Sequence, residues 1–379
     1  MTWLQLWRGH SLFIMHRLLS IGRFVWIIIG VFLYSCSKDV VIAQEVRVVD
    51  SVYVTDSKIY TDTVFVSDTM VKCVRKYDNP VLQKNIADPS VICGENGIFY
   101  LYSTESQLFP NIPIYKSIDL VNWYFVGSAF NDSTRPTSFD GNLWAPDINC
   151  INGKYVLYYS MSVWGGEWTC GIGVAMADYP WGPFENVAKL FDSREIGVRN
   201  SIDPFYIEDH GEKYLFWGSH HGIFGIQLSD SGLSVKEGAE KFQISGNGGE
   251  GSYIYLHNNQ YYLFQSLGSC CSGLSSTYNI RVGRADNLRG PYYDRQGKPM
   301  MESIGTLLLQ GNTFVAGPGH NSEIITDDDG VDWILYHGYQ RSDPALGRIL
   351  YLDKINWDGG WPFIEGYSAS LSSEIPFFK

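Results

Sequence analysis

The residues best placed to do chemistry in this 379-residue chain are four acids and a histidine that recur along it. They are Asp88, Asp147, Asp203, Glu250 and His320, with separations of 59, 56, 47 and 70 residues. Hydrolysis of a glycosidic bond needs one protonated carboxyl group for the leaving oxygen and one carboxylate that activates water or attacks carbon. A third acid nearby can hold up the pKa of the proton donor. Asp88, Asp203 and Glu250 can fill these three roles.

Each of the five residues opens the first arm of a predicted strand pair. The first arms are 87–92, 145–148, 202–205, 250–254 and 319–324, and the second arms are 99–103, 155–160, 214–219, 261–266 and 333–337. Turn-like stretches such as Glu95–Gly97 separate the arms. The second arms are aromatic and apolar, and most end in Ser or His. Five such units with variable loops predict an all-β fold, a five-bladed β-propeller.

In a propeller, residues with this spacing would lie close together and could form a site. If the five residues begin the innermost strands, they all point towards one mouth of the central axis, where like charges shift one another's pKa values. A single acid at a strand start is often only a turn cap. Five in phase favour a functional cluster.

The composition narrows the possible ligands. The chain is 45% hydrophobic and 15% aromatic, which excludes disordered and collagen-like classes. Its net charge is −12 and we find no run of Lys and Arg, so nucleic acid is not an expected partner. Aromatic side chains and low charge suit sugars, whose C–H faces stack on rings, although a β-rich core explains the same composition. No organic cofactor is expected.

Residues 1–35 are predicted to be a signal peptide. The apolar run Phe24–Tyr34 follows Arg17 and Arg23, and Met15 offers an alternative start. The sequence LYSC that ends at Cys36 resembles a bacterial lipobox, so we expect Cys36 to carry a lipid. A cleaved secretory signal with an incidental cysteine is the alternative. The expected location is the bacterial cell envelope, on the periplasmic or surface face of the outer membrane.

Residues 36–78 are predicted to be a lipid-anchored spacer, and residues 79–379 the catalytic propeller, which we expect to be monomeric. The spacer holds a two-copy repeat, 50–57 and 62–69, with strand-like alternation; an extra strand or pairing surface is the alternative. The six cysteines after Cys36 have no zinc-site spacing. They are interpreted as structural thiols or disulfides whose pairing cannot be read from the sequence.

Several motifs together resemble glycoside hydrolase family 43. They lie around Asp88, at 144–147, at 200–204, at 250–251 and at 317–322, and the resemblance covers roughly residues 79–379. Members of that family are five-bladed, inverting hydrolases of arabinose- and xylose-containing polysaccharides. The resemblance implies that Asp88 is the general base, Glu250 the general acid, and Asp203 the residue that tunes and orients the acid.

Segments 269–284, 290–294 and 347–362 are similar to the endo-arabinanase branch, which cuts α-1,5-linked L-arabinofuranose chains. Two departures, Ala87 before the base where His is common and Ser252 after the acid where Pro is usual, bear on subsite specificity. We therefore expect endo-hydrolysis of α-1,5-L-arabinan. The alternatives are an exo-acting α-L-arabinofuranosidase or β-xylosidase, and a non-catalytic glycan-binding propeller, which would not need all three acids.

The remaining site predictions concern the metal and the substrate. An axial His320 is compatible with a core residue, a substrate donor or a metal ligand; the resemblance favours a calcium-like ion held by this one histidine and water. Asp147 matches a motif position that supports the site. We expect it to belong to the substrate-binding set with Trp144, Trp164 and Arg348. Each Trp is either a sugar platform or blade packing, and Arg348 either binds sugar hydroxyls or pairs with an axial acid.

Overall fold

The computed structural model of the protein describes residues 75–246 and 248–379 in full and, earlier in the chain, only the backbone of short strands. These early strands are β1 Gln5–Arg8, β2 Ser11–Ser20, β3 Arg23–Val31, β4 Asp39–Val40, β5 Ser51–Thr55 and β6 Lys58–Asp62, followed by β7 Val74–Asp78. The chain divides into two units, Met1–Tyr77 and Asp78–Lys379.

In the first unit, β1, β2 and β3 form an antiparallel sheet, and β5 pairs with β6. β5 coincides with part of the first copy of the predicted repeat, while Cys36 and nearly all of the second copy lie outside the described residues. The signal peptide, lipid anchor and spacer therefore stay predictions. No helix in the described part of the chain is long and apolar enough to cross a membrane.

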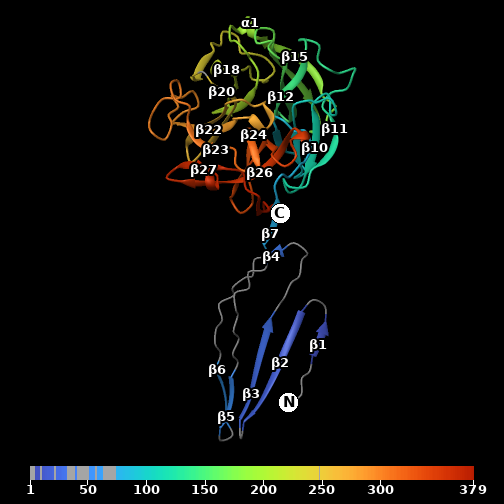
Figure 1. The fold of residues 1–379 in the computed structure, drawn as a ribbon, viewed down its shortest axis with the longest axis vertical. Coiled ribbons are helices and arrows are strands. Elements are labelled where there is room, and N and C mark those ends of the chain that lie inside the picture. The colour runs from blue at the N-terminus through green and yellow to red at the C-terminus, as the bar shows by residue number, and fades with distance from the viewer. Residues whose placement is uncertain are drawn as a thin grey trace. The chain divides into compact units, whose positions relative to one another are not determined.

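The second unit contains five antiparallel four-stranded sheets, the blades I to V (Figure 1). Their strands are, for blade I, β8 Ser90–Cys93, β9 Phe99–Tyr102, β10 Pro113–Ser117 and β11 Tyr124–Ser128; for blade II, β12 Asn142–Ile151, β13 Lys154–Ser162, β14 Gly171–Ala177 and β15 Glu185–Asp192; for blade III, β16 Phe205–Asp209, β17 Glu212–Trp217, β18 Ile223–Gln227 and β19 Phe242–Ser245; for blade IV, β20 Gly249–His257, β21 Gln260–Leu267, β22 Asn279–Ala285 and β23 Thr306–Leu309; and for blade V, β24 Val315–Thr326, β25 Asp332–Gln340, β26 Arg348–Asp358 and β27 Trp361–Phe363. Short elements complete the unit: α1 Ser193–Ile196, the 3₁₀ turns η1 Gly273–Ser275, η2 Pro344–Leu346 and η3 Glu365–Tyr367, and β28 Ser372–Glu374.

The innermost strands form a closed ring. β8, β12, β16, β20 and β24 each contact the next in this order, and β24 contacts β8 again. All five predicted strand pairs are present, as β8–β9, β12–β13, β16–β17, β20–β21 and β24–β25. The prediction of an all-β, five-bladed propeller is confirmed.

The second strand of each blade is apolar along most of its length because neighbouring blades cover both of its faces. β13 is buried at every position after Lys154, and β25 is buried up to Gln340. Such two-sided burial requires continuous apolar runs rather than alternation. The core therefore lies between blades, in clusters that join blades I and II, blades II and III, and blades III to V.

The segment from Asn79 to Ile86 runs along β26 and closes the ring between blades V and I. Asn79 exchanges side-chain hydrogen bonds with the backbone of Leu352, and the Val81 N–H donates to Leu350 O at 3.0 Å. At its end, the Ile86 N–H donates to Arg348 O at 2.7 Å. This pairing brings the start of blade I beside Arg348.

Candidate active site

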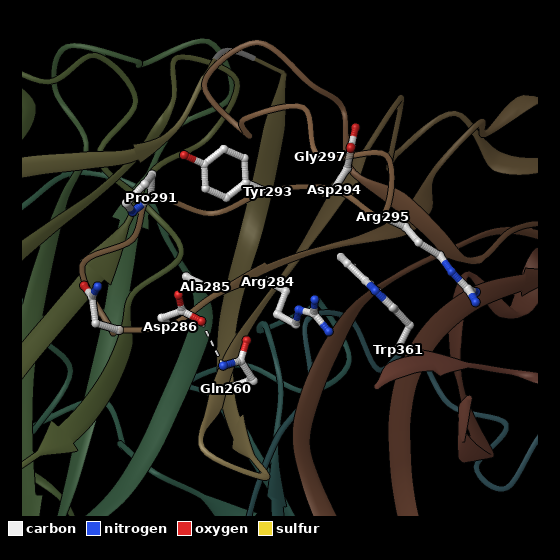
Figure 2. Close-up of a pocket in the computed structure, with 11 residues that line it drawn as sticks. Gln260, Arg284, Ala285, Asp286, Pro291, Tyr293, Asp294, Arg295, Gly297 and Trp361 are labelled. Atoms are coloured by element: carbon white, nitrogen blue, oxygen red, sulfur yellow. Dashed lines mark hydrogen bonds between the residues drawn. The ribbon is translucent and has the colours of Figure 1, made fainter. Parts of the chain in front are cut away.

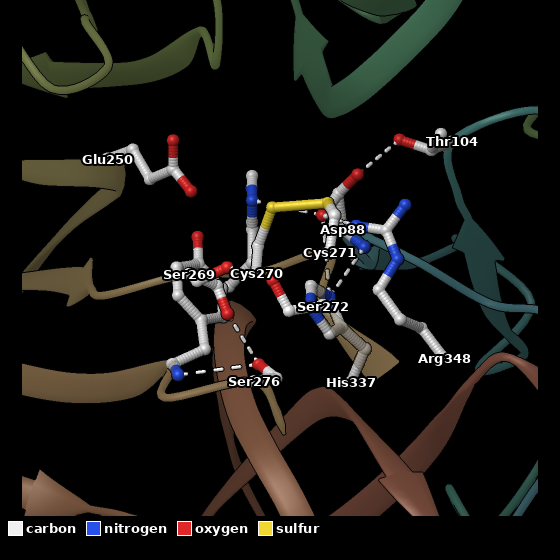
Figure 3. Close-up of a disulfide and its surroundings, with 12 residues drawn as sticks. Asp88, Thr104, Glu250, Ser269, Cys270, Cys271, Ser272, Ser276, His337 and Arg348 are labelled. Carbon is white, nitrogen blue, oxygen red and sulfur yellow. Dashed lines mark hydrogen bonds and ion pairs between the residues drawn. A yellow bond between two sulfur atoms is a disulfide. The ribbon is translucent and has the colours of Figure 1, made fainter. Parts of the chain in front are cut away.

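A cavity of about 510 Å³ opens where the innermost strands begin, and the three predicted catalytic acids all line it. Asp88 comes from the loop before β8, Asp203 from the loop before β16 and Glu250 from β20. The three side chains thus reach one cavity from blades I, III and IV. Figure 3 shows Asp88 and Glu250 with the loop between β21 and β22.

A second cavity, of about 460 Å³, lies at blade IV beside Arg284, Tyr293 and Trp361 (Figure 2). Two of its polar side chains already have partners within the cavity: Gln260 donates to Asp286 at 2.9 Å, and the Arg284 guanidinium lies over the Trp361 ring. None of the three predicted catalytic acids lines it. We therefore place the chemistry in the first cavity.

One residue in each blade adopts a left-handed backbone conformation at the start of the innermost strand. These residues are Asp88 (φ 54°), Ala145 (41°), Asp203 (60°), Gly251 (55°) and His320 (47°). Such φ values are uncommon for residues other than Gly and persist only where the surrounding structure holds them. The fivefold repeat of the conformation turns the side chains of Asp88, Asp203 and His320 towards the cavity.

The N–H group of each left-handed residue is held by a side chain from the preceding blade. The acceptors are Thr104 Oγ1 for Ala145 (2.8 Å), Ser160 Oγ for Asp203 (2.9 Å), Asp203 Oδ2 for Gly251 (3.0 Å), Ser266 Oγ for His320 (2.8 Å) and His337 Nδ1 for Asp88 (3.0 Å). Several of these acceptors are the Ser or His residues that close the second arms in the sequence. Their recurrence there was a visible sign of this role.

Asp88 is buried among positive charges. Its Oδ1 lies 3.2 Å from Arg348 Nη1 and 3.2 Å from His320 Nδ1, and its Oδ2 accepts from Thr104 Oγ1 at 2.5 Å. Burial by itself would raise the pKa of Asp88, but the charges of Arg348 and His320 outweigh it and hold the pKa well below its usual range. Asp88 is therefore ionised in the folded protein.

Asp203 and Glu250 form the other side of the acid cluster. Glu250 Oε2 accepts from Ser219 Oγ at 2.6 Å and lies 3.2 Å from His220 Nε2, while Asp203 binds the Gly251 N–H. Burial, opposed by His320 and reinforced by Glu250 and Asp88, raises the pKa of Asp203 to about 7. Below that pH, the Asp203 carboxyl group retains its proton.

His320 lines the cavity beside Asp88. Burial would lower its pKa, but Asp88 and then Asp203 and Glu250 raise the pKa to about 9. Among residues 75–246 and 248–379, no group of three or more His, Cys, Asp or Glu side chains could hold a metal ion. Ca²⁺ normally takes six to eight oxygen ligands, so an ion held by one imidazole would be mostly hydrated. The calcium-like ion beside His320 stays a prediction, and no step of the proposed reaction uses it.

Trp144, Trp164 and Arg348, three members of the predicted substrate-binding set, line the cavity. Their role in binding substrate stays a prediction. The Trp144 and Trp164 rings meet edge to face at 6.5 Å, and Trp164 is 79% exposed at the rim. An exposed ring is available for a sugar face, unlike a ring packed inside a blade. Of the two interpretations of Arg348, the structure shows the pairing with an axial acid, Asp88.

The prediction for Asp147 needs correction, because it does not line the cavity. The pairing of β12 with β13 is irregular between Trp144 and Asp147, so Ala145 takes the left-handed position in blade II. Asp147 falls two residues further along the strand, where its carboxylate accepts from the Tyr206 N–H at 2.9 Å. Burial and then Glu323 raise its pKa. Asp147 thus belongs to a buried layer of the axis that sequence spacing could not separate from the cavity.

Several residues of the cavity were not predicted as site residues from the sequence, including Thr104, His220, Tyr278 and the Cys270–Cys271 pair. Cys270 and Cys271 are joined by a disulfide, and Cys93, Cys150 and Cys170 carry free thiols. The adjacent pair is visible in the sequence, but its pairing is not. Tyr278, whose pKa is raised by burial and by Glu250, had no comparable signal.

Comparisons with known proteins agree with this geometry. The family model described as Glycosyl hydrolases family 43 matches residues 77–362. The extracellular exo-α-(1→5)-L-arabinofuranosidase ArbA of Cellvibrio japonicus is 36% identical, over 75% of this chain and 87% of its own. The extracellular endo-α-(1→5)-L-arabinanase 1 of Bacillus subtilis is 33% identical, over 73% and 86%. The solved structure of Cellvibrio cellulosa α-L-arabinanase complexed with arabinohexaose is similar with a TM-score of 0.67 and 33% identity, covering 76% of this chain and 98% of that one.

Proposed function

The chain belongs to glycosyl hydrolase family 43, and from this premise we propose that it hydrolyses α-1,5-linked L-arabinofuranose chains at internal bonds. The observation that carries the proposal is the convergence of Asp88, Asp203 and Glu250 on one cavity that Trp144 and Trp164 also line. The relatives whose names specify arabinan, both endo- and exo-acting, support the substrate class.

The electrostatics of the cavity suit an acid and a base of opposite protonation state. Asp88 is ionised beside Arg348 and His320, as a general base must be. The raised pKa of Asp203 keeps a proton on this carboxyl group up to about pH 7, which limits the negative charge beside Glu250, the proposed general acid. A non-catalytic glycan-binding propeller would not need an ionised carboxylate and a protonated carboxyl group in the same cavity.

In the proposed reaction, Asp88 accepts a proton from a water molecule as the water oxygen attacks the anomeric carbon. The bond from that carbon to the glycosidic oxygen breaks, and Glu250 donates a proton to the leaving oxygen. Asp203 positions this acid through its hydrogen bond to the Gly251 N–H, next to Glu250 in the chain. Attack by water opposite the leaving group inverts the anomeric centre.

The exposed Trp164, whose ring contacts that of Trp144 in the same cavity, offers a second aromatic surface for a sugar and supports internal cleavage over exo action. Contacts with sugars remote from the scissile bond stabilise the transition state of a long chain more than that of a dimer. An exo-acting α-L-arabinofuranosidase is the second candidate, because one of the two bacterial relatives carries that name.

Digestion of linear α-1,5-arabinan tests the proposed function directly. We expect mixed short arabino-oligosaccharides from the first minutes, faster cleavage of longer oligomers than of the dimer, and initial formation of the β anomer by proton NMR. Arabinan branched with single arabinose units and xylo-oligosaccharides serve as comparison substrates. Arabinose alone from the outset would support the exo-acting enzyme, and release of xylose would support a β-xylosidase. Initial formation of the α anomer would contradict inversion.

The pH profile should report the proton retained beside Glu250. Since the pKa of Asp203 is raised to about 7, we expect kcat/KM to fall as the pH rises through about 7, when this proton is lost. On the acid side, Asp88 stays ionised well below the usual pKa of an aspartate, so activity should persist to low pH. An Asp203→Asn variant should have a lower maximum and a displaced alkaline limb. The same alkaline limb in this variant would show that Asp203 is not the titrating group.

A further inference from the structure

The disulfide between Cys270 and Cys271 lies in the wall of the active-site cavity. Both cysteines line it together with Asp88, Asp203 and Glu250. They belong to the loop between β21 and β22 of blade IV, the blade that supplies Glu250. In Figure 3 the sulfur–sulfur bond is drawn between the side chains of Glu250 and Asp88.

The loop that carries the disulfide is anchored at both ends. The Ser269 N–H donates to Thr277 Oγ1 at 3.1 Å, and Ser276 Oγ donates to Ser269 O at 2.5 Å. Asn279 Nδ2 donates to Leu267 O at 3.0 Å, which joins the neighbouring strand ends. The anchored loop therefore presents the disulfide to the cavity in a defined position.

Stabilisation of the fold does not account for this bond. The stabilisation that a disulfide provides by restricting the unfolded chain grows with the length of the loop it closes, and Cys270 and Cys271 are adjacent. Cys270 is only half-buried and Cys271 is exposed, so the pair is not part of the core. The sulfur atoms instead add apolar, polarisable surface to a cavity whose floor is ionic.

We propose that the Cys270–Cys271 disulfide is a substrate-binding wall, against which the apolar C–H face of an arabinofuranose residue packs. Trp144 supplies an aromatic surface to the same cavity from blade II, and the disulfide comes from blade IV, which is not adjacent to blade II in the ring. The bond locks two neighbouring side chains into one rigid surface, so little conformational entropy is lost when sugar binds. This inference rests on the proposed arabinan hydrolysis.

The test compares the untreated protein, the protein reduced with a phosphine, and the variants Cys270→Ala, Cys271→Ala and the double variant. In the untreated protein, the tryptic peptide that contains both cysteines should lack two hydrogens relative to its reduced form. Reduction and every variant should raise KM for linear arabinan about tenfold, the size of effect expected for lost contacts in an apolar pocket. The value of kcat should not change, because the lost contacts stabilise the bound substrate and the transition state equally. The melting temperature should not change either, because the bond closes no long loop of the chain.

Matched controls separate the disulfide from other thiols. Reduction of the double variant should have no further effect, and a Cys93→Ser variant, altered at an exposed free thiol, should respond to reduction like the unmodified protein. An unchanged KM after reduction would overturn the inference while leaving arabinan hydrolysis intact. So would a lowered melting temperature that accounts for the rise in KM, or free thiols at Cys270 and Cys271 in the untreated protein. Failure of the untreated protein to cleave arabinan would overturn the proposed function and this inference with it.

Discussion

Replacing Glu250 with glutamine should lower kcat on linear arabinan by about 10²- to 10⁴-fold, the usual contribution of a general acid. The glutamine keeps the size of the side chain, and its Oε1 can still accept the hydrogen bond from Ser219 Oγ. What it lacks is the proton for the leaving oxygen. Aryl arabinosides with a good leaving group need little protonation, so their hydrolysis should decrease far less.

The test is specific because it compares the fall in kcat on linear arabinan with the fall in kcat on an activated aryl arabinoside. A Glu240→Gln variant, altered at an exposed acid near β19, should match the unmodified protein on both substrates. Equal losses on arabinan and on the activated aryl substrate would assign Glu250 a different role. Near-normal turnover of arabinan would remove it from the mechanism.

Replacing Asp88 with asparagine should lower turnover by a similar factor, about 10²- to 10⁴-fold, but equally for arabinan and aryl arabinosides. The water nucleophile needs a base whatever the leaving group is. Asparagine tolerates the left-handed conformation that Asp88 adopts (φ 54°), so the backbone is preserved. It carries no charge for Arg348 and His320, and it cannot accept a proton from water.

Binding of an arabino-oligosaccharide, measured by calorimetry, shows whether the Asp88→Asn variant keeps its cavity. We expect binding to persist while hydrolysis is lost. An Asp178→Asn variant, altered at an exposed ion pair with Lys154, serves as the control. If Asp88→Asn spared arabinan hydrolysis, or if its loss depended on the leaving group, Asp88 would not be the general base.

The family resemblance and the arrangement of blades could be recognised in the sequence because they depend on local patterns. Apolar second arms, turn residues and a recurring ionisable residue repeat five times, and the closed ring brings equivalent positions together. That is why Asp88, Asp203 and Glu250 could be selected from sequence alone. The same logic failed for Asp147, because the left-handed position of blade II is Ala145, two residues earlier, and a difference of two residues is hidden by the variable spacing of the repeat.

Local sequence patterns therefore predict the propeller, its five strand pairs and the three acids at strand starts. The protonation of those acids and the residues that surround them depend on the tertiary structure. Arg348 reaches Asp88 across 260 residues of sequence, and His320 reaches it from another blade. The Cys270–Cys271 disulfide faces the cavity because its loop is anchored at the end of blade IV. Electrostatic interactions depend on distance in space, and closure of the ring brings residues from both ends of the propeller to one axis. No local sequence pattern therefore indicates that Arg348 and His320 lie beside Asp88.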